Sequence, residues 1–167
     1  MNIRSEQEMI DFGTTLGREF SEGVTDTEGL PQSSRREELR EGSVRQDPRR
    51  KTVIELIGDV GAGKTTFVRG LAKGLGIKEP ITSPSFTISK SYAFKDKEGK
   101  EKNLVHYDFY RLGDPGLMAN DLADSINNPD NLVVIEWADS IDEILPENRL
   151  KITINYNEDN TREVTIS

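Results

Sequence analysis

One eight-residue stretch limits the possible folds of this chain more than any other feature of its sequence. Residues 58–65 spell GDVGAGKT and match the pattern G-x-x-x-x-G-K-[ST] at every position. The β-branched run TVIELI at residues 52–57 predicts a strand before this motif, and residues 65–76 predict a helix with an apolar stripe after it. A glycine-rich turn between a strand and a helix is the context that a phosphate-binding loop requires. The sequence therefore predicts nucleotide binding.

The residue types in this loop have separate physical tasks. Glycines let the backbone turn so that successive N–H groups point at one anion, and the N-terminus of the following helix adds the positive end of its dipole. Lys64 is predicted to reach the β- and γ-phosphate oxygens, and the Thr65 hydroxyl is predicted to join a Mg²⁺ shell. The residues predicted to bind the nucleotide are Gly58, Asp59, Val60, Gly61, Ala62, Gly63, Lys64, Thr65 and Thr66.

ATP with Mg²⁺ is the predicted cofactor. The guanine-reading pattern N-K-x-D is absent from the sequence. The pattern D-x-x-G follows the phosphate loop only at residues 96–99, inside a charged turn and not at a strand end. A signalling GTPase is therefore disfavoured.

The remaining patterns predict an α/β fold, with a mixed β-sheet flanked by helices, like that of phosphate-loop NTPases, and a C-terminal antiparallel hairpin. Helices are expected at residues 5–20, 117–126 and 138–145, and further strands at 86–94, 103–112, 131–137, 149–156 and 162–167. Ser5 is the expected N-cap of the first helix, with Glu8 completing a capping box. Gly13 and Gly17 weaken that helix but allow close packing. The phosphate loop and the residues that act with it should meet at the carboxyl edge of the sheet.

A single domain over residues 1–167 is predicted, with a charged insertion at residues 21–51. The chain has 167 residues, which fits one domain. Fourteen of the 31 residues in the insertion are charged and four are apolar. Because such a stretch offers little surface to a core, it is predicted to be a flexible segment.

Composition excludes several classes of site and partner. The chain has no cysteine, and His106 is its one histidine, so disulfides, thiolate zinc sites, cysteine nucleophiles and histidine-pair metal sites are excluded. The net charge is −8, and residues 112–167 hold 12 acidic and 3 basic side chains. Since an acidic surface repels phosphate backbones, contact with RNA is expected only through a partner or through the more basic residues 1–111. The sequence has neither an apolar N-terminal region nor a run of about 20 apolar residues, so no membrane contact and a cytoplasmic location are expected.

Two acids are candidates for the metal and catalytic roles beside the phosphate loop. Glu136 ends the apolar run at residues 132–135, which is the arrangement of a metal-binding acid after a buried strand. Asp108 lies in a strand pattern, and the pattern alone favours a solvated surface acid, because acids on exposed strand faces are common. Trp137 fits core packing as well as a site.

With these residues in view, the chain resembles the bacterial TsaE family, the small ATPases of tRNA threonylcarbamoyladenosine biosynthesis. The segments that carry the resemblance follow the family's order: GDVGAGKTTFVRGLAKGLG at 58–76, ITSPSFTI at 81–88, HYDFYRL at 106–112 and LVVIEWAD at 132–139. EQEMIDFGTTLGREF also resembles the family's first helix. Three features depart from the family: Ser85 replaces the usual threonine, the insertion at 21–51 is longer, and residues 116–126 lack the usual glutamate-rich pattern.

The resemblance implies an ATPase that is weak alone and acts with partner proteins. These partners are a threonylcarbamoyl transferase subunit and its non-catalytic paralogue, of the TsaD and TsaB types, so that the chain drives or resets their complex and meets tRNA only indirectly. The resemblance implies that Thr65 and Glu136 bind Mg²⁺, and that Asp108 lies near the γ-phosphate and acts in catalysis with Lys64. Candidates for switch or partner-linked roles are Ser83, Ser85, Trp137 and Arg111.

Two other functions are compatible with the same motif. A small-molecule kinase would usually need a lid with arginines and an acceptor pocket, and Arg111 is the one clear arginine near the predicted site. A nucleotide-gated binding module would use the same residues with negligible turnover. Measuring phosphate release without any other acceptor separates these functions.

Overall fold

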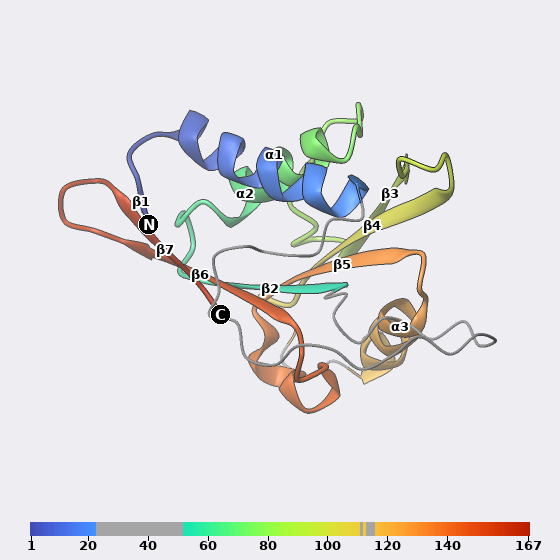
Figure 1. Ribbon diagram of the computed structural model, residues 1–167. Helices are drawn as coiled ribbons and strands as arrows, with labels where there is room; N and C mark the ends of the chain where they lie inside the picture. The colour runs from blue at the N-terminus through green and yellow to red at the C-terminus, as the bar shows by residue number, and fades with distance from the viewer. Residues whose placement is uncertain (23–51, 111, 113–115) are drawn as a thin grey trace, which may run out of the picture.

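The computed structural model describes residues 1–22, 52–110, 112 and 116–167, which form a seven-stranded sheet with helices on both faces (Figure 1). The strands are Asn2–Ile3 (β1), Val53–Ile57 (β2), Ser89–Lys95 (β3), Glu101–Asp108 (β4), Asn131–Glu136 (β5), Leu150–Tyr156 (β6) and Arg162–Ile166 (β7). The helices are Glu6–Glu22 (α1), Lys64–Gly74 (α2) and Gly116–Asn127 (α3), with 3₁₀ turns at Ala138–Ser140 (η1) and Asp142–Ile144 (η2). Residues 21 and 22 of the predicted insertion complete α1; its other residues and Arg111 lie outside the described residues.

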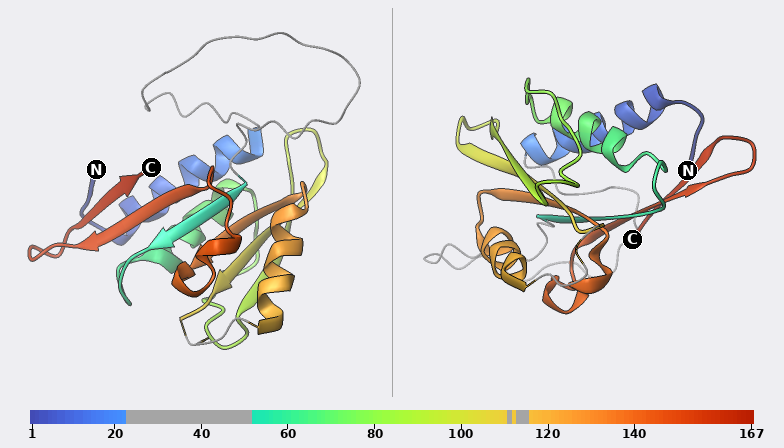
Figure 2. Two further views of the ribbon diagram at one scale, coloured as in Figure 1. Left: turned by 90° about the horizontal axis from the view of Figure 1, so that it is seen from below. Right: turned by 180° about the vertical axis from the view of Figure 1, so that it is seen from behind.

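The sheet is mixed, as the sequence predicts. Its strand order is β1-β7-β6-β2-β5-β4-β3. Strands β4, β5, β2 and β6 run parallel, whereas β3 and β7 run antiparallel to their neighbours β4 and β6. The apolar runs of β2 and β5 place them at the centre, because alternate residues serve both faces: Val134 packs with the α1 and α2 side, and Ile135 packs with the α3 side. Seen from below, α3 lies in front of the sheet and α1 behind it (Figure 2).

Glu55 interrupts the apolar pattern in the middle of β2. Its side chain is 10% exposed, and its carboxylate accepts a hydrogen bond of 2.5 Å from Arg149 Nε, with Lys151 Nζ at 3.6 Å. Arg149 also donates to Asp142 and to the Pro146 carbonyl. A buried carboxylate is stable only with such partners. The network therefore ties the central strand to the turns that follow β5.

Helices α1 and α2 pack closer than side chains normally allow. A Cβ built on Gly13 would lie 2.4 Å from the Phe67 carbonyl oxygen, and one built on Gly70 would lie 2.3 Å from the carbonyl oxygen of Ile10. Gly17 approaches the backbone of α2 in the same way. The expectation that the glycines of the first helix serve close packing is confirmed, and α2 supplies matching glycines.

We expect Gly70→Ala to lower the free energy of unfolding by about 2 kcal/mol, because the added methyl meets only backbone atoms and forces the two helices apart. This cost exceeds the gain of about 1 kcal/mol in helix propensity. Thermal unfolding followed by circular dichroism checks it, with a melting temperature about 4–8 °C lower. The exposed Thr15→Ala on the outer face of α1 is the control. A melting temperature equal to that of the unsubstituted chain would contradict the close approach.

The strands beside the candidate site are shorter than the sequence predicts. Residues 86–88 do not belong to β3: the Ile88 N–H donates to the Pro84 carbonyl at 2.6 Å, and Ile88 has a φ of +66°. Strand β4 ends at Asp108, not at residue 112, because the Asp108 carboxylate itself accepts the Tyr110 N–H at 3.0 Å. A polar side chain thus satisfies a backbone donor that a continuing strand would have paired.

One predicted helix needs correction, and one short strand was not predicted. The helix expected at residues 138–145 is a pair of 3₁₀ turns, η1 and η2, since the stretch is confined between Trp137 in the left-handed conformation and Pro146. The short strand β1 was not predicted, because two residues give no pattern. It forms because the chain start pairs with β7, where the Val164 N–H donates to the Met1 carbonyl at 2.8 Å.

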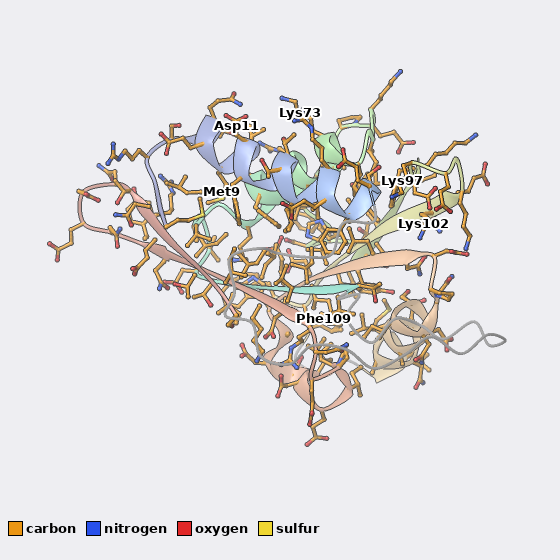
Figure 3. The ribbon with its side chains drawn as sticks, viewed as in Figure 1. Met9, Asp11, Lys73, Lys97, Lys102 and Phe109 are labelled. Carbon is orange, nitrogen blue, oxygen red and sulfur yellow. The ribbon has the colours of Figure 1, made fainter. Side chains whose placement is uncertain are left out.

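The two faces of the sheet carry separate apolar clusters. Met9 of α1 and Phe109 after β4 lie on opposite sides of the sheet (Figure 3). Under α3, the buried Tyr107 hydroxyl donates to the Asp121 carboxylate at 2.6 Å. Burial, and then this bond, raises the pKa of the Tyr107 phenol above its ordinary value, so the hydroxyl stays a donor. Within the described residues, none of the helices combines the length and the apolar character that a membrane crossing needs.

Deleting residues 24–47 is expected to leave the fold and ATP binding intact. This stretch contains few apolar residues, and loop-closure free energy changes by only about 0.6 kcal/mol for each doubling of loop length. We expect the melting temperature to change by less than about 5 °C. Calorimetry of the deletion variant with ATP tests whether ATP binding is unchanged. A much larger drop in melting temperature would mean that the deleted residues pack against the domain.

Candidate nucleotide site

The candidate site forms at the carboxyl edge of the sheet, where three parallel strands end together. The phosphate loop follows β2, Asp108 ends β4 and Glu136 ends β5. In the register of the sheet, Glu136 pairs with Leu56 on one side and with Asp108 on the other. The two candidate acids are therefore neighbours, although 27 residues separate them in the chain.

Three glycines give the phosphate loop its shape. Gly58, Gly61 and Gly63 have φ values of +151°, +84° and +114°, which residues other than glycine rarely adopt. At Gly58 a Cβ would also lie 2.4 Å from the Ile154 carbonyl oxygen of the neighbouring strand β6. Helix α2 starts directly after Gly63 without a side-chain cap, so its first N–H groups remain available to an anion.

The Lys64 amine lies under the loop, close to an acid and an aromatic ring. Its Nζ donates to the carbonyl oxygens of Gly58 at 2.7 Å and Asp59 at 3.0 Å. The same Nζ is 3.8 Å from Glu136 Oε2 and 4.5 Å from the centre of the Trp137 ring. The loop, the acid and the ring face thus hold the positive charge of Lys64 at the position where phosphate oxygens would enter.

Glu136 is buried, with its two carboxylate oxygens in different surroundings. Oε1 lies 2.9 Å from His106 Nε2, and Oε2 is the oxygen nearer to Lys64. The side chain is 4% exposed. Its position at the end of a buried strand agrees with the metal-binding arrangement, and its partners explain how a carboxylate is tolerated there.

Asp108 anchors the loop that contains Ser83 and Ser85. Its Oδ2 accepts hydrogen bonds from Ser83 Oγ at 3.0 Å and from Ser85 Oγ, and the two hydroxyls are 2.7 Å apart. Its Oδ1 accepts the Tyr110 N–H. Asp108 is thus a buried acid with three donors and not a solvated strand carboxylate, and the Ser85 hydroxyl is one of these donors.

Trp137 lies at the mouth of the site in a strained backbone conformation. Its φ is +60°, which is unusual for a residue with a large side chain, and its ring contacts the Tyr110 ring at 4.8 Å between centroids. The ring also packs partly against the apolar cluster under the sheet. The Trp137 side chain therefore contacts both this apolar cluster and the Lys64 amine.

These residues surround a cavity of about 330 Å³. The phosphate loop and α2 contribute Val60, Gly61, Gly63, Lys64, Thr65 and Thr66. The facing wall contains Ser83, Ser85, Asp108, Tyr110, Glu136 and Trp137. Of the remaining predicted binding residues, Gly58 and Asp59 hold the Lys64 amine, and Ala62 packs into the core beneath the loop.

A second cavity, of about 290 Å³, adjoins the first across the phosphate loop. It shares Gly61, Gly63 and Thr66 with the first cavity. Its other lining residues are Ser5, Glu6 and Met9 from the start of α1, and Arg162 from β7. The two cavities together give the loop an entrance on each side.

The residues suit Mg²⁺ only in combination with phosphates. Within the described part of the chain, no cluster of three acidic or histidine side chains could hold a metal ion. Mg²⁺ at nucleotide sites is bound by few protein oxygens, with phosphate oxygens and water supplying the rest. Thr65 and Glu136 both line the first cavity and offer a hydroxyl and a carboxylate oxygen, which fits that pattern.

Comparison with known proteins identifies the family of this chain. A family model described as "Threonylcarbamoyl adenosine biosynthesis protein TsaE" matches residues 3–164. The chain belongs to the TsaE family. A tRNA threonylcarbamoyladenosine biosynthesis protein TsaE from Bacillus subtilis is 42% identical over 116 residues, which cover 69% of this chain and 68% of that protein. The protein of the same name from Treponema pallidum is 32% identical over 164 residues, which cover 98% of this chain and 96% of its own length.

A solved structure shares the TsaE fold of this chain. The crystal structure of Bacillus subtilis YdiB matches it with a TM-score of 0.62 at 30% sequence identity, covering 99% of this chain and 82% of that one. The predicted fold class, a mixed sheet flanked by helices with a C-terminal antiparallel hairpin, is confirmed.

Sequence reasoning missed several residues of this TsaE-family site. His106 was noted only as a lone histidine, although its place in HYDFYRL, two residues before Asp108, puts it on the same face of β4 as that acid. Tyr110 lies in the same motif. Glu6, Met9 and Arg162 gave no signal, because β1 and β7 bring both ends of the chain to the phosphate loop only in the folded sheet.

Proposed function

We propose that this TsaE-family chain is an ATPase of tRNA threonylcarbamoyladenosine biosynthesis that drives or resets a threonylcarbamoyl transferase complex. The single observation that best supports the proposal is the convergence of Lys64, Glu136 and Asp108 on one cavity beside the phosphate loop. The partners proposed are the transferase subunit and its non-catalytic paralogue, of the TsaD and TsaB types. Contact with tRNA is indirect in this proposal, and the location is cytoplasmic.

The phosphates of ATP are proposed to lie in the first cavity. The loop N–H groups and the start of α2 bind phosphate oxygens, and the Lys64 amine moves from the Gly58 and Asp59 carbonyls to the β- and γ-phosphates. Thr65 and Glu136 hold Mg²⁺, which, when bound, neutralises charge on the transferring phosphoryl group. The ribose and base continue past Thr66 into the second cavity, toward Glu6 and Arg162.

Asp108 is proposed to control hydrolysis through the loop that it anchors. Its oxygens accept bonds from Ser83, Ser85 and the Tyr110 N–H, so the carboxylate holds two hydroxyls at the wall that faces Lys64. These hydroxyls are placed to contact a γ-phosphate or the attacking water. Catalysis by positioning suits phosphoryl transfer, in which the protein supplies alignment and charge stabilisation.

The alternative reaction for the same cavity is phosphate transfer to a small molecule. A small-molecule kinase would need arginines and an acceptor site beside the γ-phosphate. Among the described residues that line the two cavities, Arg162 is the one arginine, and it lies in the second cavity, on the far side of the loop from Asp108 and Glu136.

Phosphate release from ATP, measured with and without the two partner proteins and with no other acceptor, tests the proposal. We expect slow release by the chain alone and faster release with the partners. Release that GTP supports equally well would contradict the choice of ATP. Binding without release under all conditions would indicate a nucleotide-gated module, and phosphate transfer only to an added small molecule would indicate a kinase.

A further inference from the structure

His106 is a fully buried histidine in contact with the proposed metal-binding acid. It lies on β4, two residues before Asp108, and its side chain is 0% exposed. The parallel register of β4 and β5 pairs His106 with Val134, so Glu136 is its diagonal neighbour on the same face. Nε2 lies 2.9 Å from Glu136 Oε1.

The surroundings of the ring determine which nitrogen carries the proton. Within the described residues, Nδ1 is buried and has no hydrogen-bond partner. A proton on Nδ1 would leave that buried donor unsatisfied and would direct the Nε2 lone pair at a carboxylate oxygen. A proton on Nε2 makes a hydrogen bond to Glu136 instead. The hydrogen-bond geometry therefore favours a proton on Nε2, directed at Glu136 Oε1.

This bond restricts the orientation of the Glu136 carboxylate. The terminal torsion of a glutamate is broad, so an unheld carboxylate can turn either oxygen toward the cavity. With Oε1 held by His106, Oε2 is left beside Lys64 at 3.8 Å, at the edge of the cavity that Thr65 also lines. A histidine–carboxylate bond behind a metal ligand commonly orients that ligand.

We propose that His106 is a positioning residue: its Nε2–H holds Glu136 Oε1 so that Oε2 is presented to the Mg²⁺ of the bound nucleotide. The inference rests on the proposed metal role of Glu136. His106 itself touches neither nucleotide nor metal in this arrangement, and it acts only through the carboxylate.

Two substitutions separate positioning from packing. In His106→Gln the amide nitrogen can occupy nearly the place of Nε2 and keep the donor, whereas His106→Leu fills similar space without a donor. The readout is the gain in affinity for a non-hydrolysable ATP analogue on adding Mg²⁺, measured by calorimetry. We expect His106→Leu to reduce this gain about tenfold or more with little change in affinity without Mg²⁺, and His106→Gln to retain most of it.

The matched control is Tyr92→Phe in the adjoining strand β3. Tyr92 is also buried, and its hydroxyl has no hydrogen-bond partner among the described residues, so its loss should leave the Mg²⁺-dependent gain unchanged. If His106→Leu weakens binding equally with and without Mg²⁺, the role is structural and the proposal fails. If Glu136→Gln itself keeps the full gain, the proposed metal role of Glu136 fails first.

A second measurement reads the contact directly and needs no substitution at His106. Because the chain has one histidine, the untagged, ¹⁵N-labelled protein gives a single set of imidazole nitrogen signals. We expect signals that show a proton on Nε2, and a shift of the Nε2 signal in Glu136→Gln. A ring protonated only at Nδ1, or signals that do not respond to Glu136→Gln, would overturn the proposal.

Discussion

Replacing Lys64 by alanine is expected to lower the affinity for Mg-ATP about 100-fold. The amine is a positive charge between the phosphate loop and Glu136, at 2.7 Å from the Gly58 carbonyl and 3.8 Å from Glu136 Oε2. A hydrogen bond between charged groups contributes about 1.5–3 kcal/mol, and the upper part of that range corresponds to about 100-fold in a dissociation constant. Isothermal titration calorimetry measures the effect.

The control for this prediction is Lys73→Ala, which removes an exposed lysine on the same helix that lines neither cavity. Its affinity should equal that of the unsubstituted chain. Unchanged affinity in Lys64→Ala would refute the assignment of the phosphate loop. Circular dichroism of both variants is needed as well, because the loss of Lys64 removes a cationic neighbour of the buried Glu136 carboxylate.

The second large effect is a difference between the two neighbouring acids. Glu136→Gln removes the charge proposed to bind Mg²⁺ and is expected to weaken Mg²⁺-dependent nucleotide binding as well as hydrolysis. Asp108→Asn is expected to spare binding and to reduce partner-stimulated phosphate release about 100-fold, the usual cost of losing one charge-positioning group in a transition state. The strand register pairs Asp108 with Glu136, so the two substitutions change adjacent positions of the sheet and their effects can be compared directly.

The structure supplies the reason for the separate role of Asp108. Its carboxylate accepts bonds from Ser83, Ser85 and the Tyr110 N–H, whereas Glu136 has an oxygen directed toward Lys64. An asparagine keeps one acceptor but turns a donor toward the two hydroxyls, which disturbs the loop and not the metal position.

ATP affinity with and without Mg²⁺, beside phosphate release, distinguishes the two roles. Ser85→Ala should reduce release in the same direction as Asp108→Asn while leaving Mg²⁺-dependent affinity unchanged, since it removes one of the hydroxyls that Asp108 holds. If Asp108→Asn lost the Mg²⁺-dependent affinity and Glu136→Gln kept it, the two acids would have exchanged roles.

Local sequence was sufficient to predict an element wherever one physical requirement determined its structure. The glycines of residues 58–63 require positive φ values that few other residues adopt, so the loop and its flanking strand and helix were predictable. The apolar run ending at Glu136 was predictable as a central strand, because only a strand buried on both faces tolerates it. Gly13 and Gly17 likewise indicated close helix packing before its partner was known.

Local sequence was insufficient wherever a side chain ends an element or pairs across the sheet. The alternating pattern continued past Asp108, yet the strand stops there because the carboxylate takes over a backbone donor. Glu55 gave no sign of its place in the centre of the sheet, since its tolerance depends on Arg149, 94 residues later in the chain.

The sequence by itself determined that a phosphate loop, an acid at the end of a buried strand and a glycine-bearing first helix would belong to one α/β domain with a mixed sheet, because each of these is set by residues within a few positions of one another. Only the tertiary structure decided where β4 ends, the strand order that places Asp108 beside Glu136, the contact of His106 with Oε1 of Glu136, and the meeting of both chain ends at the second cavity. Strand register and long-range pairing depend on how the whole core is buried, and no short segment of the chain carries that information.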